Sequence, residues 1–513
     1  MTDAAHKAGI QEVVLWDHSL YDLEYYPKKF RTGPNGTLDL DDSEFWDWFK
    51  QDYRDMLNLV PEIDGLVLTF IETGARAERQ YSKRLRTNQE KLAAVVNAVA
   101  EVVIGERKLN LYARTFAYTH KEYDNIVGAM KLFQRPQIRL MMKETPHDFF
   151  LTHPNDFFAG SIARPTIIEF DTGAEFNGQG LIVNTWPQHI LDRCRSLLHR
   201  RHVIGYTART DRYGNTRIIG RPSEINLLAL KRYFEDRSVT AEKIYDEFIA
   251  SRYGAGALPY IKAAFKNAFD IITSTHYTLG TNTANHSKLD YDPYTSSYAR
   301  HVSGKWFDPP IVFVKHGVNH KFHYWKDVIN HLAPAWAKKP ENEQLKTEVP
   351  WVLKNGWVRP EELMNEEYLN YVVIEKTYGV ELTETSLRQI EKAKPHLSKD
   401  AYLDLYHYFN RTLLTARLHR AVASAYFGFR VYGRGQVFRT PTLIETARKG
   451  LREIKDVAQA IKDYPVKPAA GQWNWAEDAE KALVYYDQIT KTGWPKGTHG
   501  VKNIYGGLTL PLN

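Results

Sequence analysis

Short apolar runs that end in polar residues recur along the chain, and they predict buried β-strands. One such run, at residues 166–170, follows Pro165 and leads into a polar segment that contains glycines. Strands are predicted at residues 12–16, 65–71, 109–118, 138–143, 166–170 and 203–207, with a last one near 275–279. The pattern therefore gives about seven strands.

Segments with the apolar spacing of helices separate these strands. Helices are predicted at residues 43–59, 88–104 and 187–199, with two more within 223–253. Strand and helix alternate at the spacing of βα units, which favours a parallel sheet. The predicted fold class is α/β, namely a (β/α)₈ TIM-like barrel. One of its eight strands has no predicted place, and the barrel could be incomplete at the N-terminus. A doubly wound sheet is the alternative, although no G-x-G-x-x-G follows the first strand.

The C-terminal third carries helical periodicity without candidate chemistry. Leu405, Phe409 and Leu413 share one helical face after a possible cap at Ser398. Another helix is expected to open at Thr440-Pro441, because proline is favoured in a first helical turn. We expect a barrel over residues 1–340 and a helical domain over 341–513, whose helices could also form a homodimer.

Three acidic residues stand at or just after predicted strand ends: Glu72, Asp148 and Glu175. A carboxylate is costly to bury unless it is paired or used. Glycoside hydrolysis needs two carboxyl sites that flank the scissile bond, one as acid and the other as base or nucleophile. The apolar strand before Glu72 could raise its pKa and keep it protonated for acid catalysis. The same pattern also describes loop acids in salt bridges, and both interpretations stay open at this point.

Cationic and polar residues follow the same strand ends. Arg114 and Lys143 come from adjacent strands and could clamp a substrate carboxylate. Glu169 lies within a strand and is expected to be a structural partner of one of them. Further candidates for substrate binding are Arg209, Asp211 and His286.

Composition narrows the function classes. The net charge of +7 is modest for 513 residues, and no basic stripe or nucleic-acid motif is present, so no nucleic-acid partner is expected. The single cysteine, Cys194, excludes a cluster of cysteine ligands, and the scattered histidines form no H-E-x-x-H, so neither a metal nor another cofactor is expected. No apolar run is long enough for a membrane span, and no signal peptide is visible. We expect a cytoplasmic protein, or a periplasmic one if the N-terminus is incomplete.

Two motifs are the most specific features, K-x-x-P-x-D at residues 143–148 and E-F-N-G-Q at 175–179. With segments 38–74, 112–118 and 203–211 they form a colinear series over roughly residues 38–254. The series resembles the α-glucuronidases of glycoside hydrolase family 67. The resemblance implies an inverting TIM-barrel enzyme with Glu72 as general acid, Asp148 and Glu175 activating water, and Arg114 and Lys143 binding the uronate carboxylate.

The chain also departs from that family. Leu68 stands where the family has a further lysine for the uronate carboxylate, and the family's N-terminal domain and first barrel strand are not expected here. The main expectation is an exo-acting hydrolase that removes a terminal α-linked glucuronate from oligosaccharides, as in xylan degradation. A hydrolase for another sugar and a non-catalytic carbohydrate-binding protein are the alternatives.

Overall fold

The computed structural model describes residues 1–512 except 72, 116–119, 146–147, 152–154, 157, 211, 279–280, 283, 290–365 and 494–507. The chain divides into two compact units. The first comprises Met1–Asp148, Asn155–Phe170 and Arg195–Thr207, and the second comprises Phe149–Pro154, Asp171–Cys194 and Ala208–Asn513. The expected domain boundary at residue 340 lies outside the described residues and stays a prediction.

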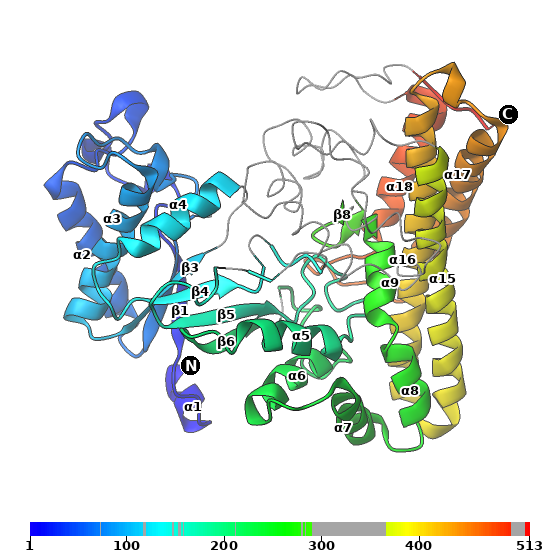
Figure 1. Cartoon of the computed structure of the whole chain (residues 1–513), viewed down its shortest axis with the longest axis horizontal. Coiled ribbons are helices and arrows are strands. Elements are labelled where there is room, and N and C mark those ends of the chain that lie inside the picture. The colour runs from blue at the N-terminus through cyan, green and yellow to red at the C-terminus, as the bar shows by residue number, and fades with distance from the viewer. Residues whose placement is uncertain are drawn as a thin grey trace. The chain divides into compact units, whose positions relative to one another are not determined.

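A six-stranded sheet is the centre of the first unit (Figure 1). Its strands, in spatial and chain order, are β1 (Val14–His18), β2 (Gly65–Thr69), β3 (Asn110–Thr115), β4 (Arg139–Lys143), β5 (Thr166–Asp171) and β6 (Val203–Arg209). Consecutive strands from β1 to β5 pair in parallel. Every residue of β2 is buried, as expected for a strand covered on both faces. The predicted α/β class with a parallel sheet is confirmed.

Helices of the first unit begin where the sequence supplies a cap. Helix α2 (Ser43–Leu59) starts after Asp42, whose side chain accepts a hydrogen bond from the Glu44 N–H. Helix α3 (Asn88–Ala100) has a reciprocal capping box between Thr87 and Glu90 and continues into a π-helical turn, η5 (Glu101–Glu106). Two shorter helices were not predicted, α1 (Thr2–Lys7) and α4 (His120–Lys131).

The strand expected near residues 275–279 does not join the parallel sheet. Instead, β7 (Tyr277–Thr278) pairs antiparallel with β8 (Thr281–Asn282), and β9 (Ala284–Asn285) pairs antiparallel with β10 (Lys288–Leu289). Only two residues separate β7 from β8, and a connection this short can join antiparallel strands but not parallel ones. The prediction of a seventh barrel strand here was therefore wrong.

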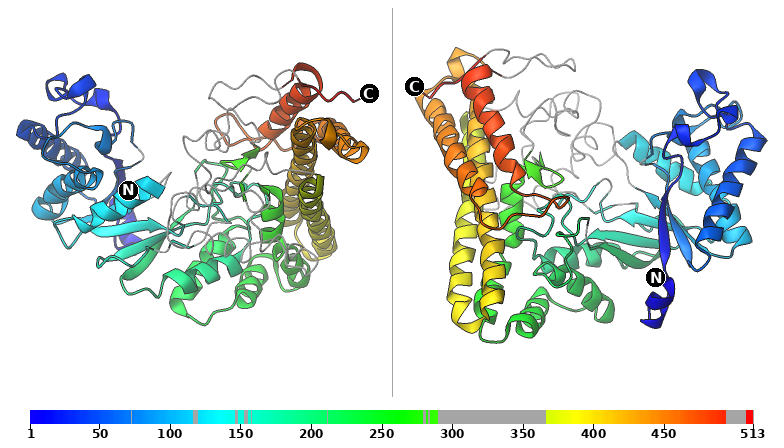
Figure 2. Two further views of the ribbon diagram at one scale, coloured as in Figure 1. Left: turned by 45° about the horizontal axis from the view of Figure 1, so that its top comes forward. Right: turned by 180° about the vertical axis from the view of Figure 1, so that it is seen from behind.

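The second unit is mostly helical in the described C-terminal region, as predicted. Its helices are α6 (Glu224–Glu235), α7 (Ala241–Tyr253), α8 (Leu258–Phe265), α9 (Ala268–Thr275), α15 (Glu366–Ala393), α16 (Lys399–Tyr432), α17 (Pro441–Lys462) and α18 (Glu477–Asp487), while α5 (Pro187–Leu197) precedes β6. Helices α15, α16 and α17, yellow to orange in Figure 2, lie side by side. Ser398 and Thr440 cap α16 and α17 as expected. No helix within the described ranges is both long enough and apolar enough to cross a membrane.

Helices α16 and α17 pack closely around two glycines, Gly428 and Gly450. A Cβ atom built on Gly450 would lie 2.6 Å from the Ala421 carbonyl oxygen and 2.7 Å from the Ala425 nitrogen. A Cβ atom on Gly428 would lie 2.7 Å from the Ala447 Cβ. Neither the backbone atoms that face Gly450 nor the Ala447 Cβ, which is fixed to the backbone, can move aside as a flexible side chain can, so neither glycine has room for a methyl group.

Replacing Gly450 by alanine should therefore destabilise the protein by about 1–3 kcal/mol, as overpacking usually does. At a solvent-exposed helix position without close neighbours, the same change would stabilise the helix by about 1 kcal/mol. Urea or thermal unfolding measures the difference. Lys449→Ala, at an exposed position of the same helix, is the control and should change the unfolding free energy little. A stabilised Gly450→Ala protein would contradict the close approach.

Candidate functional site

The structure places the predicted site residues in two groups, one in each compact unit. The first unit contains Arg114, Lys143 and Asp148. The second unit contains Glu175, Arg209 and His286. Glu72 and Asp211 lie outside the described residues, so their predicted roles stay predictions.

A buried ion pair joins Arg114 on β3 to Glu169 on β5. The Arg114 Nε donates to Glu169 Oε2 at 2.8 Å, and Nη2 donates to Oε1 at 3.2 Å. The side chains are only 4% and 1% exposed, and the guanidinium lies 4.6 Å from the ring centre of Trp16. This is the bidentate contact that an arginine typically forms with a carboxylate. The expectation that Glu169 is a structural partner is confirmed, with Arg114 as the residue it pairs with.

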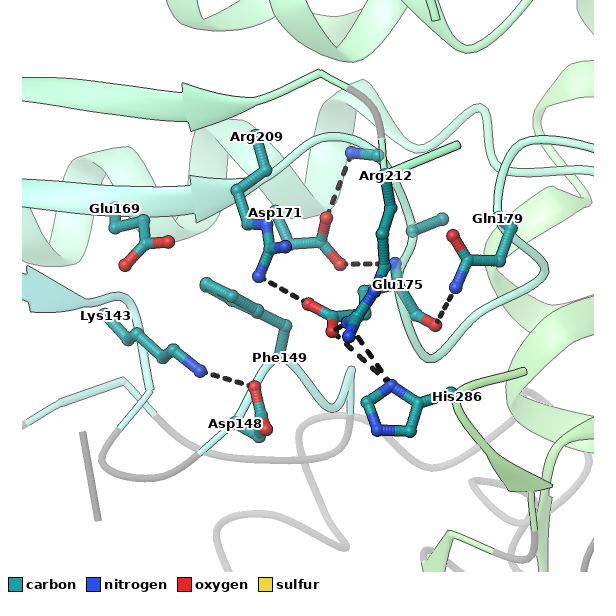
Figure 3. A network of polar contacts seen from close by, with 12 residues as sticks. Lys143, Asp148, Phe149, Glu169, Asp171, Glu175, Gln179, Arg209, Arg212 and His286 are labelled. Carbon is teal, nitrogen blue, oxygen red and sulfur yellow. Dashed lines mark hydrogen bonds and ion pairs between the residues drawn. The ribbon is translucent and has the colours of Figure 1, made fainter. Parts of the chain in front are cut away.

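The second pair of the first unit joins Lys143, at the end of β4, to Asp148 in the loop that follows (Figure 3). The Lys143 Nζ lies 2.5 Å from Asp148 Oδ1. The Thr145 hydroxyl donates to the Asp148 carbonyl oxygen at 2.6 Å. Burial lowers the pKa of Lys143, while the charge of Asp148 acts in the opposite direction. The carboxylate thus compensates an ammonium group that is 3% exposed.

A tight loop at residues 171–180 positions Glu175 in the second unit. Asp171, the last residue of β5, accepts hydrogen bonds from the Gly173 N–H at 3.0 Å and the Glu175 N–H at 2.7 Å. Ala174 and Gln179 have positive φ angles of +58° and +54°, which residues other than glycine rarely adopt. Such backbone strain persists only where surrounding contacts hold it, and it is frequent at functional sites.

Contacts from within the loop and from far along the chain hold this conformation. The Gln179 Nε2 donates to the Glu175 carbonyl oxygen at 3.0 Å. The Ser287 hydroxyl donates to the same oxygen at 2.8 Å and accepts from the Gly178 N–H at 2.7 Å. A Cβ on Gly178, whose φ is +103°, would lie 2.1 Å from Ile182 Cγ1, so only glycine fits there.

Three basic side chains converge on the carboxylate of Glu175 (Figure 3). Arg209 Nη1 lies 2.5 Å from Oε2, Arg212 forms an ion pair with Oε1, and His286 Nδ1 lies 3.4 Å from Oε1. The imidazole stacks on Phe176, with ring centres 4.8 Å apart. Glu175 is 7% exposed, whereas the three basic groups are 29%, 39% and 49% exposed. A buried carboxylate is therefore surrounded by basic groups that solvent can reach.

This arrangement suits an ionised carboxylate better than a carboxylic acid, because opposite charges nearby favour the charged form. An ionised carboxylate can accept a proton or orient a water molecule. The accessible arginines can also contact an anionic ligand. The described residues contain no group of three or more histidine, cysteine, aspartate or glutamate side chains that could hold a metal ion.

The sequence analysis missed two residues that contact the candidate site residues, Arg212 beside Glu175 and Trp16 beside Arg114. Arg212 was not a candidate, although it lies three residues after Arg209 in the same polar stretch, and this spacing was the available signal. Trp16 was assigned only to a strand, and nothing in its neighbourhood pointed to a contact with Arg114.

Comparisons with known proteins give a fold but no sequence family. The chain matches no protein-family model, and no curated protein matches it in sequence. Among solved structures it is similar to a GH138 enzyme targeting pectin rhamnogalacturonan II, with a TM-score of 0.53 and 12% identity over 95% of this chain and 56% of that one. The chain thus shares the fold of a glycoside hydrolase while spanning little more than half its length.

Two further solved structures have TM-scores below 0.5 and do not establish a shared fold. One is a GH115 4-O-methyl-α-glucuronidase with specificity for decorated arabinogalactans, at 0.44 with 11% identity over 94% of this chain and 52% of that one. The other is a GH89 enzyme from Clostridium perfringens in complex with GlcNAc-α-1,4-galactose, at 0.38 with 12% identity over 90% and 43%. None of these three is a family 67 enzyme, so that resemblance stays a prediction.

The buried Arg114–Glu169 pair makes a prediction for stability. Glu169→Gln should destabilise the protein by about 3–5 kcal/mol, because it removes the charge that compensates a buried guanidinium. Glu106→Gln is the matched control, since Glu106 makes the same two-pronged contact with Arg54 but at 39% and 30% exposure. An exposed pair of this kind contributes about 1 kcal/mol or less. Similar losses for both variants in urea unfolding would contradict the role given to burial.

Proposed function

We propose that the protein is a glycoside hydrolase that acts on oligosaccharides. The observation that carries the proposal is the buried Glu175 carboxylate, set after a parallel strand in a strained loop and surrounded by accessible basic groups. The fold shared with the GH138 enzyme supports the same class. We further propose that the parallel sheet is part of a TIM-like barrel, in which active sites lie at the carboxyl ends of the strands.

The proposed mechanism is inverting and divides the work between carboxyl groups. Glu72 protonates the leaving oxygen, and Asp148 and Glu175 orient and deprotonate the attacking water. The basic side chains beside Asp148 and Glu175 support these roles, because both carboxyl groups must be ionised to act on water. No covalent intermediate is needed in this scheme.

The proposed substrate has a terminal α-linked uronic acid, most simply glucuronate. Arginine suits the two-pronged recognition of a carboxylate. Arg209 and Arg212, with His286 when it is protonated, are the best exposed candidates. Arg114 and Lys143 are nearly buried and already paired with Glu169 and Asp148, so we give them a supporting role in the electrostatics of the site.

One observation favours a different sugar as the second candidate. Leu68, which occupies the place of the lysine expected from the family 67 resemblance, is fully buried in β2. A buried leucine cannot form an ion pair with a substrate carboxylate. The site therefore has one cationic contact fewer with which to select a uronic acid over a neutral sugar.

A substrate panel tests the proposed function and separates the two candidates. The purified protein should release sugar from 4-nitrophenyl α-glucuronide and from glucuronoxylan oligomers faster than from the matching α-galacturonide and neutral α-glucoside. Preference for a neutral glycoside would favour the second candidate. Binding to the oligomers without release of any sugar would overturn the proposed hydrolysis.

Carboxyl-to-amide variants should lose activity in two distinct ways. Glu175→Gln should lower kcat about 10²–10⁴-fold on every substrate, because activation of water is always required. Glu72→Gln should cost much less with nitrophenyl leaving groups, which need little protonation, than with xylan oligomers. Glu224→Gln is the control and should retain activity, because Glu224 on α6 only forms a surface ion pair with Arg252 on α7. Full activity of Glu175→Gln would exclude its proposed role.

A further inference from the structure

A cavity of about 680 Å³ lies within the first compact unit. The end of β1, the loop after it and the second half of α2 form its lining. Cavities of about 300–1,000 Å³ are the usual size for small organic ligands. The lining shares no residue with the groups to which glycoside cleavage is assigned above.

The cavity concentrates negative charge in a chain whose net charge is positive. Four carboxyl groups line it, those of Asp17, Asp22, Asp52 and Asp55. Of the residues that the structure describes, no lysine or arginine contributes to the lining. Burial, with the charges of Asp17 and Asp55, raises the pKa of Asp52. A cation in the cavity would relieve this mutual repulsion.

Tyrosines hold the carboxylates in place and offer ring surfaces to a ligand. The Tyr25 hydroxyl donates to Asp52 Oδ1, and the Tyr53 hydroxyl donates to Asp17 Oδ2, both at 2.6 Å. Tyr21 and Tyr25 line the cavity and are 66% and 60% exposed. An aromatic ring attracts a cation to its face, and such rings are a common way to bind quaternary ammonium groups.

A buried hydroxyl in the lining points independently to a ligand. Ser19 lines the cavity and is 4% exposed. Its Oγ has no hydrogen-bond partner among the described residues. A buried polar group without a partner is unfavourable, so a ligand hydroxyl or N–H that reaches Ser19 would gain a hydrogen bond that the protein leaves open.

A bare metal ion fits the cavity less well than an organic cation. In the described parts of the chain, no three acidic or histidine side chains come close enough together to hold one metal ion. The carboxylates are instead spread around a volume that is many times larger than an ion.

We propose that this cavity binds a small organic ammonium compound. The aspartates compensate its charge, the exposed tyrosines cover its alkyl groups, and Ser19 bonds to a hydroxyl or N–H of the ligand. This binding does not depend on glycoside hydrolysis.

Choline and its neutral isostere 3,3-dimethylbutan-1-ol test the proposal, because they share a shape and differ in charge. Calorimetry or ligand-observed NMR with the full-length protein should give choline an affinity at least about tenfold higher than that of the alcohol. Equal affinities would overturn the proposal. So would displacement of choline by Ca²⁺ at equal concentration, or tighter binding of neutral methyl galactoside.

Two substitutions at exposed positions locate the binding without a risk to folding. Asp55→Asn and Tyr21→Leu should each weaken choline binding about fivefold or more. Asp47→Asn removes the same charge from α2 outside the cavity, at 79% side-chain exposure, and should leave the affinity unchanged. Unchanged binding in both cavity variants, or an equal loss in Asp47→Asn, would show that choline binds elsewhere.

Discussion

Compensation of buried charge is the constraint on which this structure depends. Taking an ion out of water costs several kcal/mol even after the protein relaxes, so each buried charge needs a partner. Arg114 has Glu169, and Lys143 has Asp148. In the helical region, Lys376 is fully buried, pairs with Glu375 and donates to backbone carbonyl oxygens at the end of α9, including those of Ser274 and Thr275. Structural charges and candidate catalytic charges therefore obey the same rule.

What distinguishes Glu175 is the unequal exposure of the groups around it. The Arg114–Glu169 pair is closed to water on both sides, so it can stabilise the fold but has little access to a ligand. Glu175 is buried, yet Arg209, Arg212 and His286 are all reachable. Ser287 and Gln179 hold the backbone carbonyl oxygen of Glu175 and so fix the main chain from which its side chain extends. This combination of fixed carboxylate and accessible cations is the basis of the proposed function.

The sequence predicted features that depend on local chemistry. Apolar runs predicted all six strands of the sheet, and the caps Ser398 and Thr440 predicted where two long helices begin. The structural role of Glu169 followed from its place within a strand. The helices α8 and α9 were missed because each is only eight residues long, which is too short for a clear helical periodicity. Which residues converge on Glu175 depends on contacts between segments far apart in the chain, so Arg212 was missed. Glu72 and Asp211 lie outside the described residues, and their roles stay predictions.

The stereochemistry of the released sugar is the most direct test of an inverting glycoside hydrolase. Proton NMR can follow the first minutes of hydrolysis of 4-nitrophenyl α-glucuronide, before the anomers of the free sugar equilibrate. An inverting enzyme gives β-glucuronic acid first, and the α-anomer then grows in by mutarotation. Initial appearance of the α-anomer would contradict inversion, and failure to release glucuronate or any other sugar would contradict the proposed hydrolysis itself.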